Sequence, residues 1–208
     1  AGSKKLFRAM PLTASFGILM ILIYAFVAIF AGAIAPYGQE EILGAANVVP
    51  GGNPAFGGNP DFPLGTDQIG RDILSRLIFG AQNTVGIAFA TTCLAFLIGA
   101  TLGFLAATLQ GWLDQLFSRT VDVLMAIPSL ILALVVLSVM PVTIPVLILV
   151  MGFLDATRVF RLARAVAVDI SVMDYVEAAR LRGEKLGWVI FREILPNALS
   201  PLVAEMGL

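Results

Sequence analysis

The ionisable residues of this chain are few, and their types exclude several kinds of chemistry. The 208 residues include no histidine and a single cysteine, Cys93, which lies within an apolar run. Histidine general-base catalysis, histidine metal sites, an intrachain disulfide and a cysteine zinc site are therefore excluded, and Cys93 is interpreted as a small buried hydrophobe. The sequence also lacks the G-x-x-x-x-G-K-[ST] phosphate loop of nucleotide hydrolases.

Two carboxylates lie close to arginines at the ends of apolar runs. Asp122 is three residues from Arg119, and Asp155 is three residues from Arg158. We interpret both pairs as local ion pairs at the edges of a membrane; a proton relay or a substrate contact is the alternative. An ion-coupled secondary transporter or channel would need carboxylates in mid-membrane, and a membrane-embedded enzyme would need a converging polar cluster, so edge positions disfavour both classes.

The segment 169–183 combines charged and small residues at helical spacing. Ser171 followed by Asp174 resembles a capping box, and Gly183 supplies a C-terminal cap, so a helix of about eleven residues is predicted between them. One stripe of this helix is apolar and the other positions are charged: Val172, Val176 and Ala179 against Asp174, Glu177, Arg180 and Arg182. A second helix is predicted at 186–195, and the resulting hairpin suits a groove on a soluble partner; an ordinary solvated loop is the alternative.

The composition shows what kind of elements must position these residues. Hydrophobic residues make up 59% of the chain and charged residues 13%. No charge occurs at 9–39, 77–113 or 123–154. Each of these runs exceeds the ~20 apolar residues that cross a ~30 Å hydrocarbon core. The sequence therefore predicts an all-α, polytopic membrane protein with a single transmembrane domain over 1–208.

The first half of the chain is predicted to cross the membrane twice. A basic N-terminus, 1–11, precedes a first span at 12–35, which we expect to be an uncleaved helix rather than a signal peptide. The loop 36–80 has no Lys or Arg before Arg71 and is predicted to be extracytoplasmic, with a short amphipathic helix at 66–79 lying at the outer interface. The second span is 82–109, where small residues recur four apart at Ala95, Gly99, Gly103 and Ala107 for close helix packing.

The apolar run 123–154 determines the rest of the topology. A single helix of that length would measure roughly 48 Å, far more than the bilayer core. Pro141 and Pro145 interrupt it, so spans at 119–139 and 144–165 are predicted. This hairpin places the basic segment 166–197 in the cytoplasm, as the positive-inside rule favours. Residues 198–208 then begin a fifth helix.

Several words of the sequence resemble a known family. Glu177-Ala178-Ala179, then Gly183, then Leu195-Pro196 resembles the EAA motif of ABC importer permeases, although Glu193 stands where the motif has isoleucine. Four sequence segments are similar to the second, C-type permease subunit of dipeptide and oligopeptide importers: 63–80, 121–129, 174–180 and 191–197. Such subunits continue through two more membrane helices, so the resemblance implies a chain truncated at its C-terminus, with about four complete spans and the start of a fifth.

The resemblance implies a function and a set of partners. The expected protein is half of the translocation pathway of an ATP-driven importer, with the type I importer permease fold and no enzymatic activity. Its partners would be a homologous second permease subunit, two cytoplasmic ABC ATPases, an extracytoplasmic binding protein and the lipid bilayer, with no nucleic acid. No cofactor is expected in this chain, because ATP and magnesium are bound by the ATPases. The location implied is the cytoplasmic (inner) membrane of a bacterium or archaeon, with the N-terminus cytoplasmic.

The EAA motif also implies which residues act. The residues expected to contact the ATPase are Tyr175, Glu177, Ala178, Ala179, Arg180, Gly183, Leu195 and Pro196. No catalytic residue and no metal ligand are expected, and the sequence identifies no substrate-binding residue. Dipeptides or oligopeptides are the expected cargo; nickel, glutathione, or an opine or sugar are the alternatives within the family.

Overall fold

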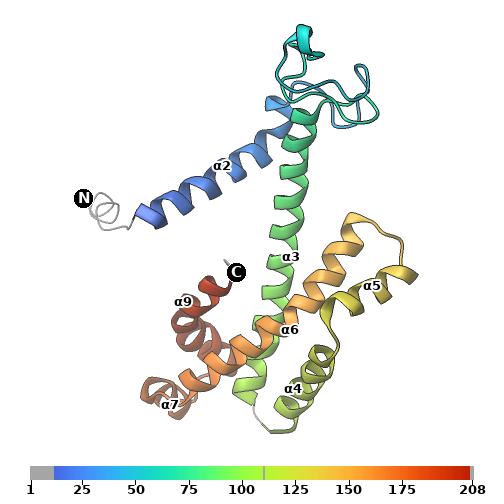
Figure 1. Cartoon of the computed structure of the whole chain (residues 1–208). Coiled ribbons are helices and arrows are strands. Elements are labelled where there is room, and N and C mark those ends of the chain that lie inside the picture. Colours follow the sequence, from blue (N-terminus) through green and yellow to red (C-terminus); the bar gives the residue numbers. More distant parts are fainter. Residues whose placement is uncertain (1–11, 110, 207–208) are drawn as a thin grey trace, which may run out of the picture. The chain divides into compact units, whose positions relative to one another are not determined.

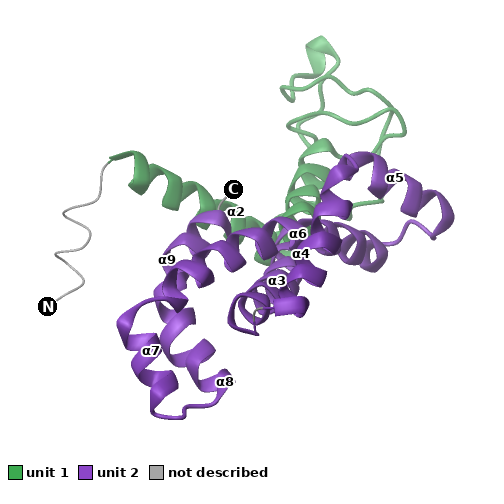
Figure 2. Cartoon of the chain, turned by 90° about the horizontal axis from the view of Figure 1, so that it is seen from below, with its two compact units in different colours: residues 1–87 green, residues 88–208 purple. Residues whose placement is uncertain are grey.

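The structure, a computed structural model, describes residues 12–109 and 111–206, and its regular elements are helices (Figure 1). In chain order they are α2 (Leu12–Ile34), a 3-10 turn (Pro54–Phe56), α3 (Ile73–Leu109), α4 (Gly111–Ala126), α5 (Ser129–Val139), α6 (Ile144–Ser171), α7 (Asp174–Leu181), α8 (Leu186–Trp188), a π-helix (Val189–Ile194) and α9 (Leu195–Met206). The chain forms two compact units, residues 1–87 and 88–208, which Figure 2 distinguishes by colour. The predicted all-α fold is confirmed.

Two helices are long and apolar enough to cross a membrane by themselves. They are α2, with 23 residues, and α3, with 37. The pair α4 and α5 is apolar enough to count as a third span, although the two helices are bent by 86° at the break between them. The first part of α6 is apolar, but Asp155, Arg158 and Arg161 lie within its first 18 residues.

The first correction concerns the start of α3. A short interfacial helix at 66–79 and a separate span at 82–109 were predicted, but the structure has one helix from Ile73 to Leu109. The helix begins where Asp72 accepts hydrogen bonds from the backbone N–H and the hydroxyl of Ser75, at 2.8 and 2.6 Å. No proline follows that could break it, and Gly80 stays helical because a single glycine lowers helix stability only slightly.

The second correction concerns the predicted helix 119–139. The chain breaks at Ile127–Pro128, so that α4 ends at Ala126 and α5 starts at Ser129. Pro128 lacks a backbone N–H, and its ring disfavours helical backbone at the preceding residue. A further non-helical stretch, 140–143, separates α5 from α6, which begins at Ile144 and continues past the predicted end at 165 to Ser171.

In unit 1, hydrogen bonds order the loop 35–72 that connects α2 with α3. The hydroxyl of Thr66 donates to the carbonyl of Ala45 at 2.6 Å and accepts the N–H of Val48 at 3.0 Å. Two glycines allow backbones to approach where no side chain would fit. A Cβ on Gly65 would lie 2.2 Å from the carbonyl oxygen of Val48, and one on Gly70 would lie 2.3 Å from that of Gly44.

In unit 2, α3 packs closely against α6 through the predicted small residues. Ala95, Gly99, Gly103 and Ala107 are all buried. A Cβ on Gly99 would lie 2.5 Å from the carbonyl oxygen of Ala156, and one on Gly103 would lie 2.8 Å from that of Phe160. The sequence pattern therefore marks a real helix–helix contact, and helix α6 forms the centre of this unit.

Candidate functional site

The candidate site is the helical hairpin formed by α7, α8 and the π-helix, residues 172–194. Its start differs from the prediction. Ser171 still belongs to α6, and its hydroxyl donates to the carbonyl of Val168 instead of capping α7. Met173 occupies the N-cap of α7 without a side-chain hydrogen bond. The capping box was therefore wrong, and α7 has eight residues rather than about eleven because α6 extends further than expected.

The end of α7 follows the prediction. Gly183 has φ +78°, a left-handed conformation that glycine adopts without strain. Its N–H donates to the carbonyl of Arg180 at 2.9 Å, and the N–H of Glu184 donates to that of Ala179 at 3.2 Å. These two bonds form a Schellman motif, so Gly183 ends the helix and turns the chain toward α8.

Helix α7 has one buried face and one exposed face. Val176 and Ala179 are fully buried. Ala178, by contrast, is exposed. Val172, which was predicted to continue the buried stripe, is 73% exposed, because it lies in the turn between α6 and α7 rather than on a helix.

An apolar core fixes the hairpin to the rest of unit 2. Its members come from α3, α6, α7, the π-helix and α9 and include Phe104, Ala163, Ala167, Val176, Ala179, Val189, Ile190, Ile194, Ala198 and Leu202. Four of these ten side chains are alanines, which allow the backbones of the elements to approach closely. The guanidinium of Arg182 also lies over the ring of Trp188, 6.0 Å from its centroid, which joins the two arms of the hairpin. The hairpin is thus a rigid extension of α6 and α9.

The second arm of the hairpin does not end at Leu195, as was predicted. The π-helix continues directly into α9 through Pro196, and Pro201 also lies inside α9. The N–H of Leu195 donates to the carbonyl of Ile190, five residues earlier, in the wide geometry of a π-helix. Pro196 has no N–H to donate, and the widened turn accommodates its ring without ending the helix.

Most of the predicted coupling residues are exposed on the hairpin or at the start of α9. The exposed ones are Tyr175, Glu177, Ala178, Arg180, Gly183 and Pro196. Leu195 is half-buried, and Ala179 faces the core instead of the surface. The prediction that both alanines are available for contact is therefore corrected: Ala178 is exposed, and Ala179 packs inside.

The predicted local ion pairs are not formed. Neither Asp122 with Arg119 nor Asp155 with Arg158 has an N–O distance within 4.0 Å in the described structure. Instead, Arg164 of α6 donates from Nε and Nη2 to the two carboxylate oxygens of Asp114 in α4, at 2.5 and 2.6 Å. The sequence gave no signal for this pair, because its members are 50 residues apart.

The position of Asp155 also differs from the prediction. It was assigned to a membrane edge, but it lies eleven residues after Ile144, the first residue of α6. At about 1.5 Å per residue this is roughly 17 Å along the helix, about half of a ~30 Å hydrocarbon core. The edge assignment followed the end of the apolar run 123–154, although the predicted span 144–165 already contained Asp155; in α6 it is an interior residue.

Membrane-length helices that pack through small residues and carry a charged hairpin define a helical membrane protein. The particular family follows from comparison with known proteins. Over residues 99–208 the chain matches the family described as the binding-protein-dependent transport system inner membrane component, and it belongs to that family. The resemblance to the permeases of binding-protein-dependent importers is thereby confirmed, and the family is described as an inner-membrane transport component.

Relatives in this family include peptide permeases. The chain is 36% identical over 195 residues to the dipeptide transport system permease protein DppC of Haemophilus influenzae, covering 91% of this chain and 64% of the relative. It is 36% identical over 194 residues to the DppC of Escherichia coli, covering 92% and 64%. It is 29% identical over 185 residues to the glutathione transport system permease protein GsiD of Pectobacterium atrosepticum, covering 89% and 60%. The chain thus spans a little over 60% of the length of these curated relatives.

Proposed function

We propose that this chain is a permease subunit of an ATP-driven importer of dipeptides or oligopeptides and forms half of the translocation pathway. The family and the names of its peptide-transporting relatives support this function. The partners proposed are a second permease subunit, two cytoplasmic ABC ATPases and an extracytoplasmic binding protein. ATP and magnesium would bind to the ATPases, so this chain needs no cofactor and catalyses no reaction.

The observation that carries the proposal is the two-faced hairpin. Its inner face is locked into the core by Val176, Ala179 and Ile194, all fully buried. Its outer face presents exposed Glu177 and Ala178 on a short, rigid helix. A force applied to the outer face is therefore transmitted to α6 and α9 rather than absorbed by the hairpin. Such an element can couple closure of an ATPase pair to rotation of membrane helices.

The charge distribution supports the proposed orientation. The hairpin and the preceding end of α6 contain Arg161, Arg164, Arg180, Arg182 and Lys185. The loop 35–72 contains a single basic residue, Arg71. The positive-inside rule therefore favours a cytoplasmic hairpin and N-terminus and an extracytoplasmic loop.

The test compares the same bulky substitution at two exposed positions, one inside the hairpin and one outside it. Ala178→Trp adds bulk to the exposed face, so the subunit should insert and fold normally but lose ATPase binding in the assembled importer. Asp169→Trp adds the same side chain at an exposed position of α6 outside the hairpin, and ATPase binding should persist. Copurification of the ATPases and binding-protein-stimulated ATP hydrolysis measure both outcomes.

A direct contact can be tested by cross-linking. Ala178→Cys in a Cys93→Ala background should form a disulfide with a cysteine placed in the ATPase groove, which also tests the cytoplasmic orientation. Normal ATPase binding by Ala178→Trp, together with no cross-link from position 178, would contradict the coupling role of the hairpin.

Glutathione is a second candidate cargo, because the GsiD relative is named as a glutathione permease component. Its identity to this chain is lower than that of the two DppC relatives, 29% against 36%. Competition by glutathione against uptake of a labelled dipeptide would separate the two cargoes.

A further inference from the structure

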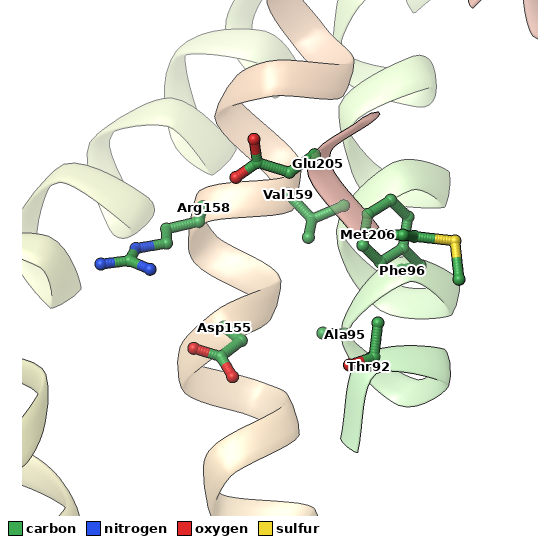
Figure 3. A pocket seen from close by; sticks show the side chains of 8 residues that line it. All are labelled: Thr92, Ala95, Phe96, Asp155, Arg158, Val159, Glu205 and Met206. Atoms are coloured by element: carbon green, nitrogen blue, oxygen red, sulfur yellow. The ribbon is translucent and has the colours of Figure 1, made fainter. Parts of the chain in front are cut away.

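Unit 2 contains a polar cavity where α3, α6 and α9 meet (Figure 3). Its volume is about 250 Å³. Helix α3 contributes Thr92, Ala95 and Phe96 to its wall. The other two helices contribute three ionisable side chains: Asp155, Arg158 and Glu205. The sequence suggested a local ion pair for the first two, with a substrate contact as the alternative, and gave no role to Glu205.

These three side chains do not neutralise one another. Within residues 12–109 and 111–206, no ion pair joins Arg158 to Asp155 or to Glu205. Figure 3 shows that the guanidinium of Arg158 and the carboxylates of Asp155 and Glu205 extend from their helices without meeting one another. The charges are therefore available to a fourth group.

The cavity lies near the middle of α3 and α6. Asp155 is eleven residues from the start of the 28-residue α6, and Thr92 is 19 residues from the start of α3 and 17 from its end. Glu205 approaches from the last turn of α9, which runs from Leu195 to Met206. Halfway along helices as long as α3 and α6 is the depth at which hydrocarbon would otherwise surround a side chain. Ionised groups there require water, a counter-charge or a ligand.

A second cavity lies beside the first and shares two of its charges. It measures about 160 Å³ and is lined by Asp155 and Arg158 together with the break between α4 and α5. Pro128 at this break caps α5 without any side-chain hydrogen bond. Non-helical backbone at membrane depth is tolerated where it lines a water-filled or protein-filled space, and transporters place substrate sites at such breaks.

We propose that Asp155, Arg158 and Glu205 line the substrate pathway and contact the charged ends of a peptide as it crosses the membrane. This inference rests on the proposed import function. A peptide with free ends has an ammonium group and a carboxylate. The carboxylates of Asp155 and Glu205 would accept hydrogen bonds from the ammonium group, and the guanidinium of Arg158 would donate to the carboxylate.

The competing explanation is a structural ion pair between these residues and the second permease subunit. A structural pair would be dry and would stabilise assembly. A substrate pathway would be accessible to water, and substitutions in it would lower transport while the complex still assembled fully. The two explanations therefore differ in water access and in the step that a substitution affects.

The first measurement is water access in the assembled importer in lipid vesicles. Thr92→Cys lies in the cavity wall, and Leu97→Cys, at a position 66% exposed on α3, is the control; both are made in a Cys93→Ala background. A cationic methanethiosulfonate reagent should label position 92 and leave position 97 unlabelled. Asp155→Asn should slow labelling at position 92, because the carboxylate attracts the cationic reagent.

The second measurement is uptake of radiolabelled alanyl-alanine. Asp155→Asn should lower the initial rate about tenfold, the loss expected for one charge-assisted hydrogen bond. Asp155→Glu should retain most of the rate, and Asp169→Asn, an exposed position on the same helix, should match the unsubstituted complex.

Three outcomes would overturn the inference: no labelling at position 92, normal uptake by Asp155→Asn, or loss of complex assembly in Asp155→Asn. An unsubstituted complex that imports no di- or tripeptide would refute the proposed cargo instead. The labelling pattern would then still decide whether the cavity is a wet pathway.

Discussion

The loop 35–72 and the hairpin 172–194 are both irregular segments between long helices, but they are held in place by different interactions. In the loop, Phe62 is the buried apolar side chain and Thr66 the buried hydroxyl side chain. The loop depends on hydrogen bonds and ion pairs. The hairpin has few side-chain hydrogen bonds and depends on buried apolar side chains.

Polar interactions in the loop converge on one turn. Asp67 accepts the backbone N–H groups of Ile69 and Arg71, each at 3.0 Å. Its second oxygen binds the guanidinium groups of Arg71 and Arg76, at 2.9 and 2.6 Å. The conformation of the loop is therefore determined by the positions of hydrogen-bond donors and acceptors. These bonds depend on the direction of the groups more than on side-chain volume.

The hairpin is specified by volume. Val176, Ala179 and Ile194 are each 0% exposed. In a closely packed core, a larger side chain at these positions would clash and a smaller one would leave a cavity. The contrast suits the proposed role of the hairpin. A hairpin that transmits force must resist deformation, and close apolar packing provides that resistance.

The largest effect is expected at Ile194 in the hairpin. Ile194→Ala removes buried methyl groups and leaves a cavity, which should cost about 2–5 kcal/mol of stability. Peptide-resolved hydrogen exchange should show faster exchange throughout 172–202 and unchanged exchange in the loop.

The matched control is Ile42→Ala in the loop, where the side chain is 67% exposed. Its effect should be within about 0.5 kcal/mol, because exposed substitutions away from special features change stability little. Equal effects of the two substitutions would contradict the distinction between a volume-specified and a polar-specified segment.

The sequence predicted those features that depend on local composition. Apolar runs indicated membrane helices, the prolines at 141 and 145 indicated the break now seen at 140–143, and Gly183 indicated the end of α7. Spacing of small residues at Gly99 and Gly103 indicated the contact with α6. Each of these signals acts within a few residues of the feature that it predicts.

Features that depend on tertiary packing were missed. Helical spacing placed Ala179 on the apolar stripe with Val176, and it faces the core, but the motif resemblance assigned both Ala178 and Ala179 to the contact surface. The pair Asp114 and Arg164 joins helices far apart in the sequence. The polar cavity was missed for the same reason, since Glu205 and Asp155 are 50 positions apart and meet only through the packing of α9 on α6.

An intermediate effect is expected at Gly65 in the loop. Gly65 has φ +77°, and a Cβ there would meet the carbonyl oxygen of Val48 at 2.2 Å. Gly65→Ala should therefore destabilise the loop by about 1–3 kcal/mol through backbone strain and displacement. Hydrogen exchange should accelerate in 45–72 and remain unchanged in the hairpin.

Gly51→Ala is the control that isolates the contact. Gly51 also has a positive φ, +108°, but a Cβ there has no neighbour within 4 Å. Its effect should be smaller than that of Gly65→Ala. If the two substitutions were equally destabilising, backbone conformation alone would explain the requirement for glycine, and the close approach to Val48 would contribute nothing.

The smallest effect is expected from acid titration of Asp67. The pKa of Asp67 is lowered from its usual 3.8, first because the backbone N–H of Arg71 donates to the carboxylate, and further through the N–H of Ile69 and the Arg71 guanidinium; burial opposes the shift. A carboxylate with a lowered folded-state pKa contributes stability that is fully present above pH 3.8. That contribution is lost as the pH falls below 3.8 toward the folded-state value.

A spin label at Gln68→Cys, in a Cys93→Ala background, would report the order of this turn. The label should be immobile at pH 6 and become mobile as the pH falls below 3.8, whereas Asp67→Asn should give a mobile label at both pH values. The mobility of a label in the hairpin at Glu184→Cys should not change with pH, because buried apolar side chains hold that segment and have no titratable groups. An acid response of equal size at both labels would mean that the hairpin, like the loop, depends on ionised groups, and the contrast between the two segments would fail.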